Sequence, residues 1–308
     1  MKVLVTGGAG YVGSILCPML LDQGHSVTIF DRFLFGEQPV LHFASHPRVT
    51  IVEGDVRERQ AIAKLVASAD CVLHLAAVVG FPACDVDPET AQSTNVEGTR
   101  HICDAVSPSQ MLIFASTGSV YGRCATVCDE TIPAAPLTLY GRSKAEGETL
   151  VLDKGGVALR FATLFGLSPR MRLDLLINSF CFIAVRDGVV DLFEGNHKRT
   201  FLHVRDGAAA YPFAIEHYAQ MAGDVFNIGS DDMNYSKIDI ACAIQRFHPF
   251  TLREAPIGVD RDARDYVVSH AKIAVLGYRP TIALEEGIQE VLRLVPFLKP
   301  RTEWRNAA

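Results

Sequence analysis

The stretch TGGAGYVG, residues 6–13, decides the fold of this chain of 308 residues. It directly follows the apolar run 2–5, and in residues 11–23 apolar side chains recur at helical spacing, so a strand enters this turn and a helix leaves it. The glycines permit a tight turn and let the backbone approach a pyrophosphate, while N–H groups at the helix start bind the anion. The stretch therefore predicts a dinucleotide-binding site with contacts from Gly7, Gly10, Tyr11, Val12 and Gly13.

The remainder of the first 165 residues alternates short apolar runs with longer amphipathic runs. The pattern predicts strands at 2–5, 26–30, 49–52, 71–75, 111–115 and 157–161, and helices at 11–23, 57–67, 88–106 and 140–152. Strands that are apolar throughout, joined by crossovers long enough for a helix, indicate a parallel sheet covered on both faces. We therefore predict an α/β fold in which residues 1–165 form a Rossmann-type, doubly wound nucleotide-binding domain.

After residue 166 the pattern is less regular and predicts a smaller α/β lobe. Helices are expected at 173–186, 204–218, 236–246 and 285–294, and strands at 190–193, 200–203, 225–228 and 251–255. We predict that residues 166–308 mainly form this substrate lobe and close one side of the cleft. Some of its segments are expected to return to the Rossmann sheet.

Composition and charge restrict the function classes. The net charge is −6 and the 29 Lys and Arg residues form no block, so we expect neither a nucleic-acid surface nor an anionic-lipid surface. No apolar run reaches the roughly 18–20 residues of a membrane span, and the first strand meets glycines too early for a signal peptide. Among the eight cysteines only residues 124 and 128 lie close together, without a second pair, so we expect free thiols, no metal and a cytoplasmic protein.

The cofactor is predicted from the ends of the next strands. Asp31 lies 18 residues after Gly13, near the offset at which an acid meets the adenosine ribose hydroxyls. Its carboxylate favours NAD by repelling the extra phosphate of NADP, whereas the adjacent Arg32 could hold that phosphate. Asp55 and Val56 could reach the adenine edge, although Asp55 could equally cap the next helix. After the fourth strand, small side chains would let backbone lie against NAD at Leu75, Ala76 and Ala77.

Tyr140 and Lys144 lie four residues apart and therefore share one face of an expected helix. A tyrosine that titrates near pH 10 is a poor base at neutral pH, but a neighbouring ammonium and a positively charged nicotinamide ring favour the phenolate. Tyr140 could then act as the general base for a substrate hydroxyl, with a second hydrogen bond from Thr117. The pair alone is a weak indication, because Tyr and Lys at this spacing are common on surface helices.

Together with the glycine turn, the pair completes a family resemblance. The whole chain resembles the extended short-chain dehydrogenase/reductase family and, within it, nucleotide-sugar epimerases and dehydratases such as UDP-glucose 4-epimerase. The matching stretches follow the family's order: TGGAGYVG (6–13), GDV (54–56), HLAA (74–77), NVEGT (95–99), STGSVYG (116–122), YGRSK (140–144), RTFLHVRD (199–206) and FNIGS (226–230).

The resemblance implies a role for each matching residue. Tyr140 would be the catalytic base, Lys144 would hold the nicotinamide ribose and lower the pKa of the tyrosine, and Thr117 would supply the catalytic hydroxyl. Asn95 would steady the cofactor side of the site, although a polar helix face explains it as well. The nucleotide-diphosphate sugar is expected to contact Phe81, Cys84, Ser116, Thr117, Thr163, Asn178, Arg199 and Arg264.

Three of these substrate contacts have ordinary alternatives. Arg199 is expected to grip the diphosphate and Arg264 to add a second phosphate contact, since a guanidinium donates two hydrogen bonds to phosphate oxygens. Either arginine could instead form a surface ion pair. Cys84 could be a buried, inert thiol. The base of the nucleotide is expected against the second lobe, at positions such as Phe165, Arg172, Asn178 and Phe193.

The reaction is predicted from Gly118 and Ser119. In the 4,6-dehydratases of the family an Asp and a Glu follow the catalytic threonine and serve as acid and base. A glycine transfers no proton, and a serine without an activating base is a poor substitute. We therefore expect a nucleotide-sugar epimerase that oxidises C4 transiently with NAD, a 4-epimerase being favoured.

Several alternatives to this prediction stay open. They are a C4 dehydrogenase or 4-ketoreductase, an atypical dehydratase and, as a different class, a non-catalytic dinucleotide sensor. The family also implies a homodimer in which the helices of 88–106 and 140–152 pair with their copies as a four-helix bundle.

Overall fold

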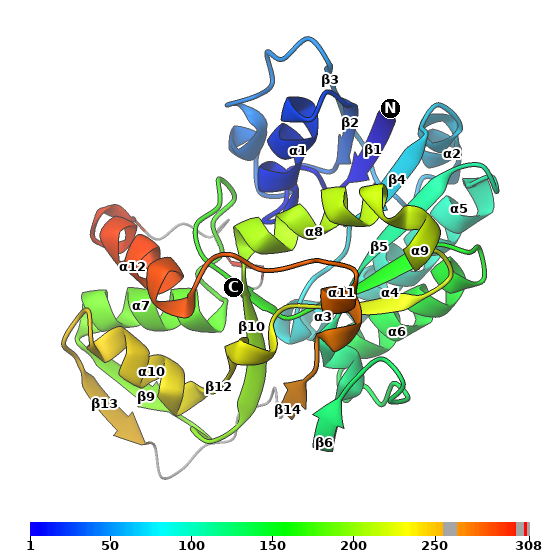
Figure 1. Cartoon of the computed structure of the whole chain (residues 1–308). Helices are drawn as coiled ribbons and strands as arrows, with labels where there is room; N and C mark the ends of the chain where they lie inside the picture. The colour runs from blue at the N-terminus through cyan, green and yellow to red at the C-terminus, as the bar shows by residue number, and fades with distance from the viewer. Residues whose placement is uncertain (255–263, 300–304, 307–308) are drawn as a thin grey trace.

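A seven-stranded parallel sheet in the order β11-β7-β5-β4-β1-β2-β3 forms the centre of the fold (Figure 1). The computed structural model describes residues 1–254, 264–299 and 305–306. Strand order reverses at β1, which pairs with β2 on one side and with β4 on the other, so ligands bind beyond the carboxyl ends of these strands. The predicted Rossmann-type sheet is confirmed. Its strands are β1 (Lys2–Thr6), β2 (Ser26–Asp31), β3 (Val49–Glu53), β4 (Cys71–His74), β5 (Met111–Thr117), β7 (Val157–Phe161) and β11 (Val225–Ile228).

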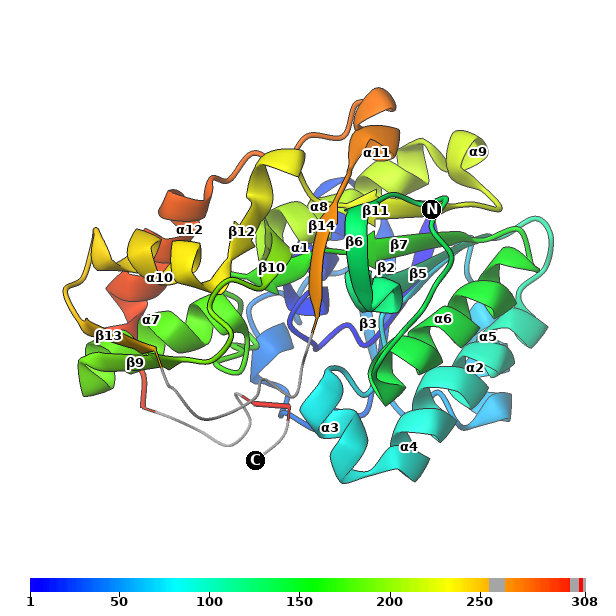
Figure 2. The same ribbon diagram turned by 90° about the horizontal axis from the view of Figure 1, so that it is seen from below.

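Helices cover both faces of this sheet, because its central strands carry apolar side chains on both sides. Val3 and Val5 of β1 belong to a core shared with α1 (Gly13–Asp22) and α8 (Val204–Glu216). Leu4 belongs to a second core with α2, α5 and α6, which lie side by side in Figure 2. These helices are α2 (Arg59–Ala67), α5 (Gly98–Ala105) and α6 (Leu139–Leu152).

The helix expected over 88–106 is divided into three parts. Asp87 caps α4 (Pro88–Gln92) by accepting a hydrogen bond from the backbone N–H of Thr90. A π-helical turn, η2 (Ser93–Glu97), then separates α4 from α5. Apolar spacing does not reveal the wider turn, and π-helical turns are frequent at functional sites. This turn carries Asn95, one of the predicted site residues.

A separate hydrophobic core holds the second lobe together. The helices that build it are α7 (Leu176–Asp187), α10 (Lys237–Gln245) and α12 (Leu284–Leu294), packed beside the paired strands β9 (Val189–Leu192) and β13 (Thr251–Glu254). Helix α10 starts where the sequence favours it, because the Ser236 hydroxyl accepts from the backbone N–H of Asp239 while the Asp239 carboxylate accepts from that of Ser236.

Two segments of the region after residue 166 lie on the main sheet. Strand β11 pairs with β7 at its edge, with Val225 opposite Ala158, and α8 packs on α1. Other elements were not expected from the sequence, because they are short or depend on pairing over long distances. They are β6 (Arg123–Cys128), β8 (Thr163–Phe165), β12 (Asn234–Ser236), β14 (Asp265–Val268), α3 (Phe81–Val86), α9 (Tyr218–Met221), α11 (Ala271–Val275), η1 (Gln38–Val40), η3 (Gly118–Tyr121), η4 (Asp231–Met233) and η5 (Val295–Phe297). The strand expected at 200–203 is present as β10 (Lys198–His203).

Candidate active site

A cavity of about 300 Å³ lies between the carboxyl ends of the sheet strands and the second lobe. It extends from Asp31, at the end of β2, to Tyr140, at the start of α6. The residues predicted for cofactor or substrate that line it are Gly7, Gly10, Tyr11, Val12, Gly13, Asp31, Arg32, Val56, Leu75, Ala76, Ala77, Phe81, Ser116, Thr117, Tyr140, Lys144, Thr163 and Arg264.

The glycine turn forms one end of the cavity through close backbone contacts. Gly7 has a φ of +73° and its N–H donates to the carbonyl of Phe30 at 2.9 Å. A Cβ on Gly7 would lie 2.8 Å from the nitrogen of Ala76, and one on Gly13 would lie 2.5 Å from the carbonyl oxygen of Gly7. Both positions therefore exclude any side chain. The turn holds the N-terminus of α1 against the cavity, where backbone N–H groups can receive a pyrophosphate.

The Asp31 carboxylate is held by one backbone N–H of the glycine turn and one of the loop after β2. One carboxylate oxygen accepts from the N–H of Ala9 and the other from that of Phe33, each at 2.9 Å. Burial nevertheless raises the pKa of Asp31 above its usual range. The neighbouring Arg32 forms an ion pair with Asp55 at 3.2 Å, so its charge already has a partner.

Asp55 does not cap a helix, since α2 begins after Glu58. Its carboxylate accepts hydrogen bonds from the backbone and guanidinium of Arg57 and faces Arg32. Asp55 does not line the cavity in the part of the chain that the structure describes, whereas its neighbour Val56 does. Asp55 thus organises the loop beside the expected adenine position.

His74 orders the end of β4. Its Nδ1 lies 2.8 Å from the Thr6 hydroxyl and its Nε2 2.9 Å from the Thr99 hydroxyl. Since Thr99 donates its own proton to the Asn95 carbonyl, Nε2 carries the imidazole proton. Burial lowers the pKa of His74 to about 3, so the ring is neutral. His74 is thus a packed core histidine.

Asn95 fixes the loop that follows β4. Its side-chain oxygen accepts from the Val78 N–H at 2.7 Å, and its nitrogen donates to the Val78 carbonyl and to the Ser143 hydroxyl at 3.0 Å each. Asn95 therefore ties the cavity-lining residue Val78 to helix α6. Asn95 itself is not among the described residues that line the cavity.

Thr117, Tyr140 and Lys144 converge at the other end of the cavity. Thr117 is the last residue of β5, and α6 begins beside it because the Thr138 hydroxyl caps the helix by accepting from the N–H of Gly141 at 3.1 Å. The Thr117 side chain lies close enough to Tyr140 to act to lower the pKa of its phenol. Lys144 is 2% exposed, and its ammonium lies 4.5 Å from the centre of the Phe114 ring.

Burial shifts the pKa values of Tyr140 and Lys144 in this trio. Burial, with a smaller effect of Cys84, raises the pKa of Tyr140 to about 12, although Arg172 and Arg264 act to lower it. Burial also lowers the pKa of Lys144 to about 8. Loss of hydration disfavours both charged forms. The lowering of the tyrosine pKa by Lys144 and the nicotinamide ring stays a prediction.

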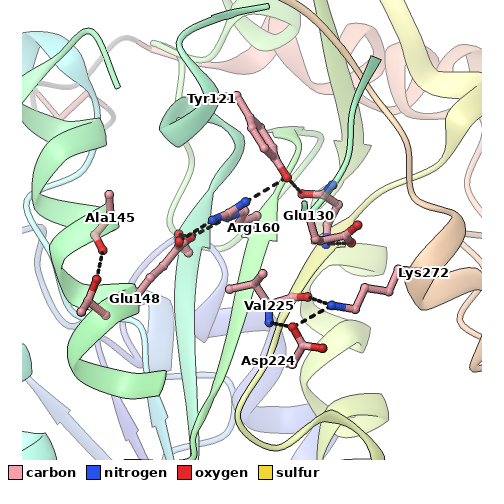
Figure 3. Close-up of polar contacts among 11 residues, drawn as sticks. Tyr121, Glu130, Ala145, Glu148, Arg160, Asp224, Val225 and Lys272 are labelled. Atoms are coloured by element: carbon pink, nitrogen blue, oxygen red, sulfur yellow. Dashed lines mark hydrogen bonds and ion pairs between the residues drawn. The ribbon is translucent and has the colours of Figure 1, made fainter. Parts of the chain in front are cut away.

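A buried polar network lies directly behind the trio. The Glu148 carboxylate accepts from Nε and Nη2 of Arg160 at 2.8 and 2.7 Å, and from the hydroxyl of Ser116. Arg160 also donates to the Tyr121 hydroxyl at 3.0 Å, so it stands between Glu148 and Tyr121 (Figure 3). The bidentate pair joins β7 to α6 one turn beyond Lys144.

The network continues to β11. Tyr121 donates to the side-chain oxygen of Asn227 at 2.8 Å, and the backbone N–H of Asn227 donates to Glu130 at 2.7 Å. The strand and helix that carry Thr117 and Tyr140 are thereby locked to the edge of the sheet.

Three residues predicted to bind the sugar nucleotide do not line the cavity within the described ranges. Cys84 is fully buried, its thiol faces the Val78 carbonyl at 3.3 Å, and burial raises its pKa to about 11. Asn178 is fully buried and bonds both the N–H and the carbonyl of Gly166. Arg199 is buried in β10. Packing on the Rossmann side accounts for Cys84, and packing within the second lobe accounts for Asn178, without a ligand.

The residues expected beside the base of the nucleotide lie in different surroundings. Phe165 is fully buried against His203 and Phe193 is exposed, and neither lines the cavity as described, whereas Arg172 does. Further residues that were not predicted line it, notably Arg170, Tyr211 and Asn306. No local pattern marks them, because Arg170 and Asn306 reach the cavity through contacts over long sequence distances and Tyr211 through the packing of α8 on the main sheet.

Within the described residues no group of three or more His, Cys, Asp or Glu side chains is placed to hold a metal ion. No helix in the same part of the chain is long and apolar enough to cross a bilayer.

The sequence is similar to those of known proteins. The model of the NAD dependent epimerase/dehydratase family matches residues 3–229. A low-salt glycan biosynthesis protein of Haloferax volcanii is 30% identical over 304 residues, which cover 94% of this chain and 96% of that protein. UDP-glucuronate 4-epimerase 4 of Arabidopsis thaliana is 28% identical over 333 residues, covering 95% and 75%.

Solved structures share the fold over nearly the whole chain. UDP-glucuronic acid 4-epimerase from Bacillus cereus, in complex with UDP-glucuronic acid and NAD, aligns with a TM-score of 0.86 at 26% identity, covering 97% of this chain and 100% of that one. The dTDP-glucose 4,6-dehydratase of Bacillus anthracis, at 22% identity and a TM-score of 0.83, covering 99% and 98%, shares the fold.

Proposed function

Because the chain belongs to the NAD dependent epimerase/dehydratase family, whose cofactor is NAD, we propose that it is a nucleotide-sugar 4-epimerase acting by transient oxidation at C4. The glycine turn, Asp31 and the trio Thr117, Tyr140 and Lys144 provide one continuous cavity for the dinucleotide and the sugar. The proposal concerns the reaction and its substrate, a sugar linked to a nucleoside diphosphate.

One observation carries the choice of reaction. Among the described residues that line the cavity, Asp31 is the only carboxylate, and it lies at the end away from Tyr140. The two positions after Thr117 hold Gly118 and Ser119, and Ser119 accepts hydrogen bonds from the hydroxyl of Thr117 and the guanidinium of Arg264. An elimination needs an acid and a base beside the sugar. Epimerisation at C4 needs only one group that removes and restores the hydroxyl proton.

Tyr140 is that group in our proposal. When bound, NAD supplies the oxidising and reducing power for the exchange at C4. The Tyr140 phenolate takes the proton of the C4 hydroxyl and, as the phenol, later returns it, and Thr117 holds the same sugar oxygen through its side chain. The raised pKa of Tyr140 suits the return of the proton, while a cationic nicotinamide ring and the nearby Arg172 and Arg264 favour the phenolate needed for its removal.

A panel of sugar nucleotides tests this reaction. UDP-, GDP-, CDP- and dTDP-sugars are incubated with the purified enzyme and followed by mass spectrometry and proton NMR, with UDP-glucuronic acid included because it is bound in the Bacillus cereus structure. We expect an isomer of equal mass. Loss of water would indicate a dehydratase, and a change of two mass units with net turnover of NAD would indicate a dehydrogenase or ketoreductase; either result rejects the 4-epimerase.

The homodimer expected from the sequence forms part of the proposal. Helices α4, α5 and α6 lie together on one face of the sheet, where a second copy could continue the layer. Multi-angle light scattering tests this, and a monomeric mass at micromolar concentration would remove the dimer from the account.

A further inference from the structure

Arg170 is a buried cation with free hydrogen-bond donors. It lies in the loop between β8 and α7, and its side chain is only 3% exposed. Its Nη2 donates to the side-chain oxygen of Asn306 at 2.7 Å, whereas Nε and Nη1 have no hydrogen-bond partner among the described residues. Burying guanidinium donors without acceptors costs free energy, so this arrangement is explained if a ligand supplies the acceptor.

The guanidinium lies at the Asp31 end of the cavity. It stacks on the Phe35 ring at 3.7 Å from the ring centre, and Phe35 follows Asp31 by four residues. After burial, the charges that act on Arg170 are those of Arg172, Asp174, Tyr11 and Asp31. Arg172 acts on Tyr140 as well, together with Arg264. Arg172 is thus shared by the two ends of the cavity, and Arg170 belongs to the Asp31 end.

The ligand group nearest to this end is defined by the fold. In a Rossmann-type site the pyrophosphate lies at the N-terminus of the first helix, and the acid after the second strand meets the adenosine ribose. Tyr11 and Asp31 mark these two places. A guanidinium matches a phosphate in charge and donor geometry. We propose that Arg170, reaching over from the second lobe, binds the pyrophosphate of the dinucleotide.

Asn306 holds Arg170 in this position. Its side-chain oxygen accepts from Arg170, and its side-chain nitrogen donates to the carbonyl of Val79 at 2.8 Å. Val79 lies in the loop after β4, on the Rossmann side of the cavity. Asn306 therefore connects the two sides and acts as a positioning residue for the guanidinium.

Cofactor binding tests the proposal directly, whatever reaction the enzyme catalyses. Protein stripped of nucleotide is titrated calorimetrically with NAD, NADP, ADP-ribose and adenosine. We expect Arg170→Met to weaken NAD and ADP-ribose by about 10- to 100-fold, as for the loss of hydrogen bonds to a charged group, and to leave adenosine unchanged. Arg170→Lys should lie between wild type and Arg170→Met, and Asn306→Ala should weaken NAD by about 3- to 10-fold by the same measure.

The matched control is Arg186→Gln, which removes an exposed arginine of the same lobe that is paired with Asp187; its affinity for NAD should stay within twofold of wild type. Circular dichroism and thermal melting show whether each variant is folded. NAD affinity within twofold of wild type in folded Arg170→Met overturns the proposal, as does an equal loss for adenosine. If Arg170→Met does not fold, unchanged NAD affinity in Arg170→Lys overturns it. A weakening confined to NADP would place the contact on the 2′-phosphate and also reject it.

Discussion

The two sides of the cavity are built from opposite kinds of residue. The sheet side offers backbone and small side chains. A Cβ added to Gly7 would lie within 3 Å of the Ala76 backbone, and one added to Gly13 within 3 Å of the Gly7 backbone. The lobe side offers three guanidinium groups, Arg170, Arg172 and Arg264. The sheet side therefore sets the shape of the cofactor site, and the lobe side supplies positive charge to the ligands.

The difference shows how each side is held in place. The sheet side depends on steric fit between neighbouring turns, so a single added methyl group disturbs it. Its catalytic end depends on the buried Glu148–Arg160 pair, which joins strand and helix. The lobe side depends on long side chains held by stacking and by a few hydrogen bonds, as for Arg170 on Phe35. Changes on the sheet side should consequently affect folding, and changes on the lobe side should affect binding.

The largest effect is expected at Tyr140, where both sides meet. Removing the hydroxyl in Tyr140→Phe eliminates the proton transfer and should lower kcat by about 100- to 10,000-fold, with NAD affinity little changed. The control is Tyr235→Phe, a hydroxyl of the second lobe on β12 outside the cavity lining as described. Steady-state kinetics on the turned-over sugar nucleotide provides the measurement. Turnover of Tyr140→Phe at the wild-type rate would remove Tyr140 from the mechanism.

Breaking the buried Glu148–Arg160 ion pair should lower the free energy of unfolding of the protein. Arg160→Met leaves the Glu148 carboxylate buried without its partner, and we expect the free energy of unfolding to fall by about 3–5 kcal/mol. Replacing both residues, Arg160→Met with Glu148→Met, should recover part of this loss because no unpaired charge remains. Urea unfolding gives the values. A double variant less stable than Arg160→Met would show that the pair matters for another reason.

Gly13→Ala tests the steric fit of the sheet side. The new Cβ would lie 2.5 Å from the Gly7 carbonyl oxygen and 2.6 Å from the Gly8 Cα, which are backbone atoms that cannot move aside separately. We expect a loss of about 3 kcal/mol in the free energy of unfolding and loss of NAD binding. The control Gly195→Ala adds a Cβ with its nearest neighbour at 3.7 Å, in the second lobe. Equal stability of both variants would contradict the account.

Acid should destabilise the sheet side through His74. Its pKa of about 3 in the folded protein lies below the usual value of 6.5, so the unfolded chain binds more protons between these pH values. The stability contribution is complete above pH 6.5 and is lost as the pH falls. Comparing pH 7 with pH 5, the wild type should lose about 2 kcal/mol more than His74→Gln. Parallel stability curves for the two proteins would show that His74 does not contribute.

The sheet side could be predicted from the sequence, because its determinants are local. The TGGAGYVG turn, the apolar strands and the Tyr140–Lys144 spacing all act within a few residues. On the lobe side, Arg172 and Arg264 were expected from the sequence. Arg170 and Asn306 could not be, since they are 136 residues apart and meet only in the folded chain. The roles of Cys84 and Asn178 were expected from where the substrate passes in the family, which gives no information on the burial of these side chains. Similarly, the charges of Tyr140 and Lys144 depend on burial that a motif does not reveal.

Transfer of an isotope label tests the central claim, transient oxidation at C4 within one cavity. The sugar nucleotide that is turned over is labelled with deuterium at C4 and incubated with enzyme carrying unlabelled NAD. We predict an epimer of unchanged mass that keeps the deuterium at C4, with no net reduction of NAD. A product that has lost the label or a molecule of water, or that accumulates together with reduced cofactor, would contradict the account.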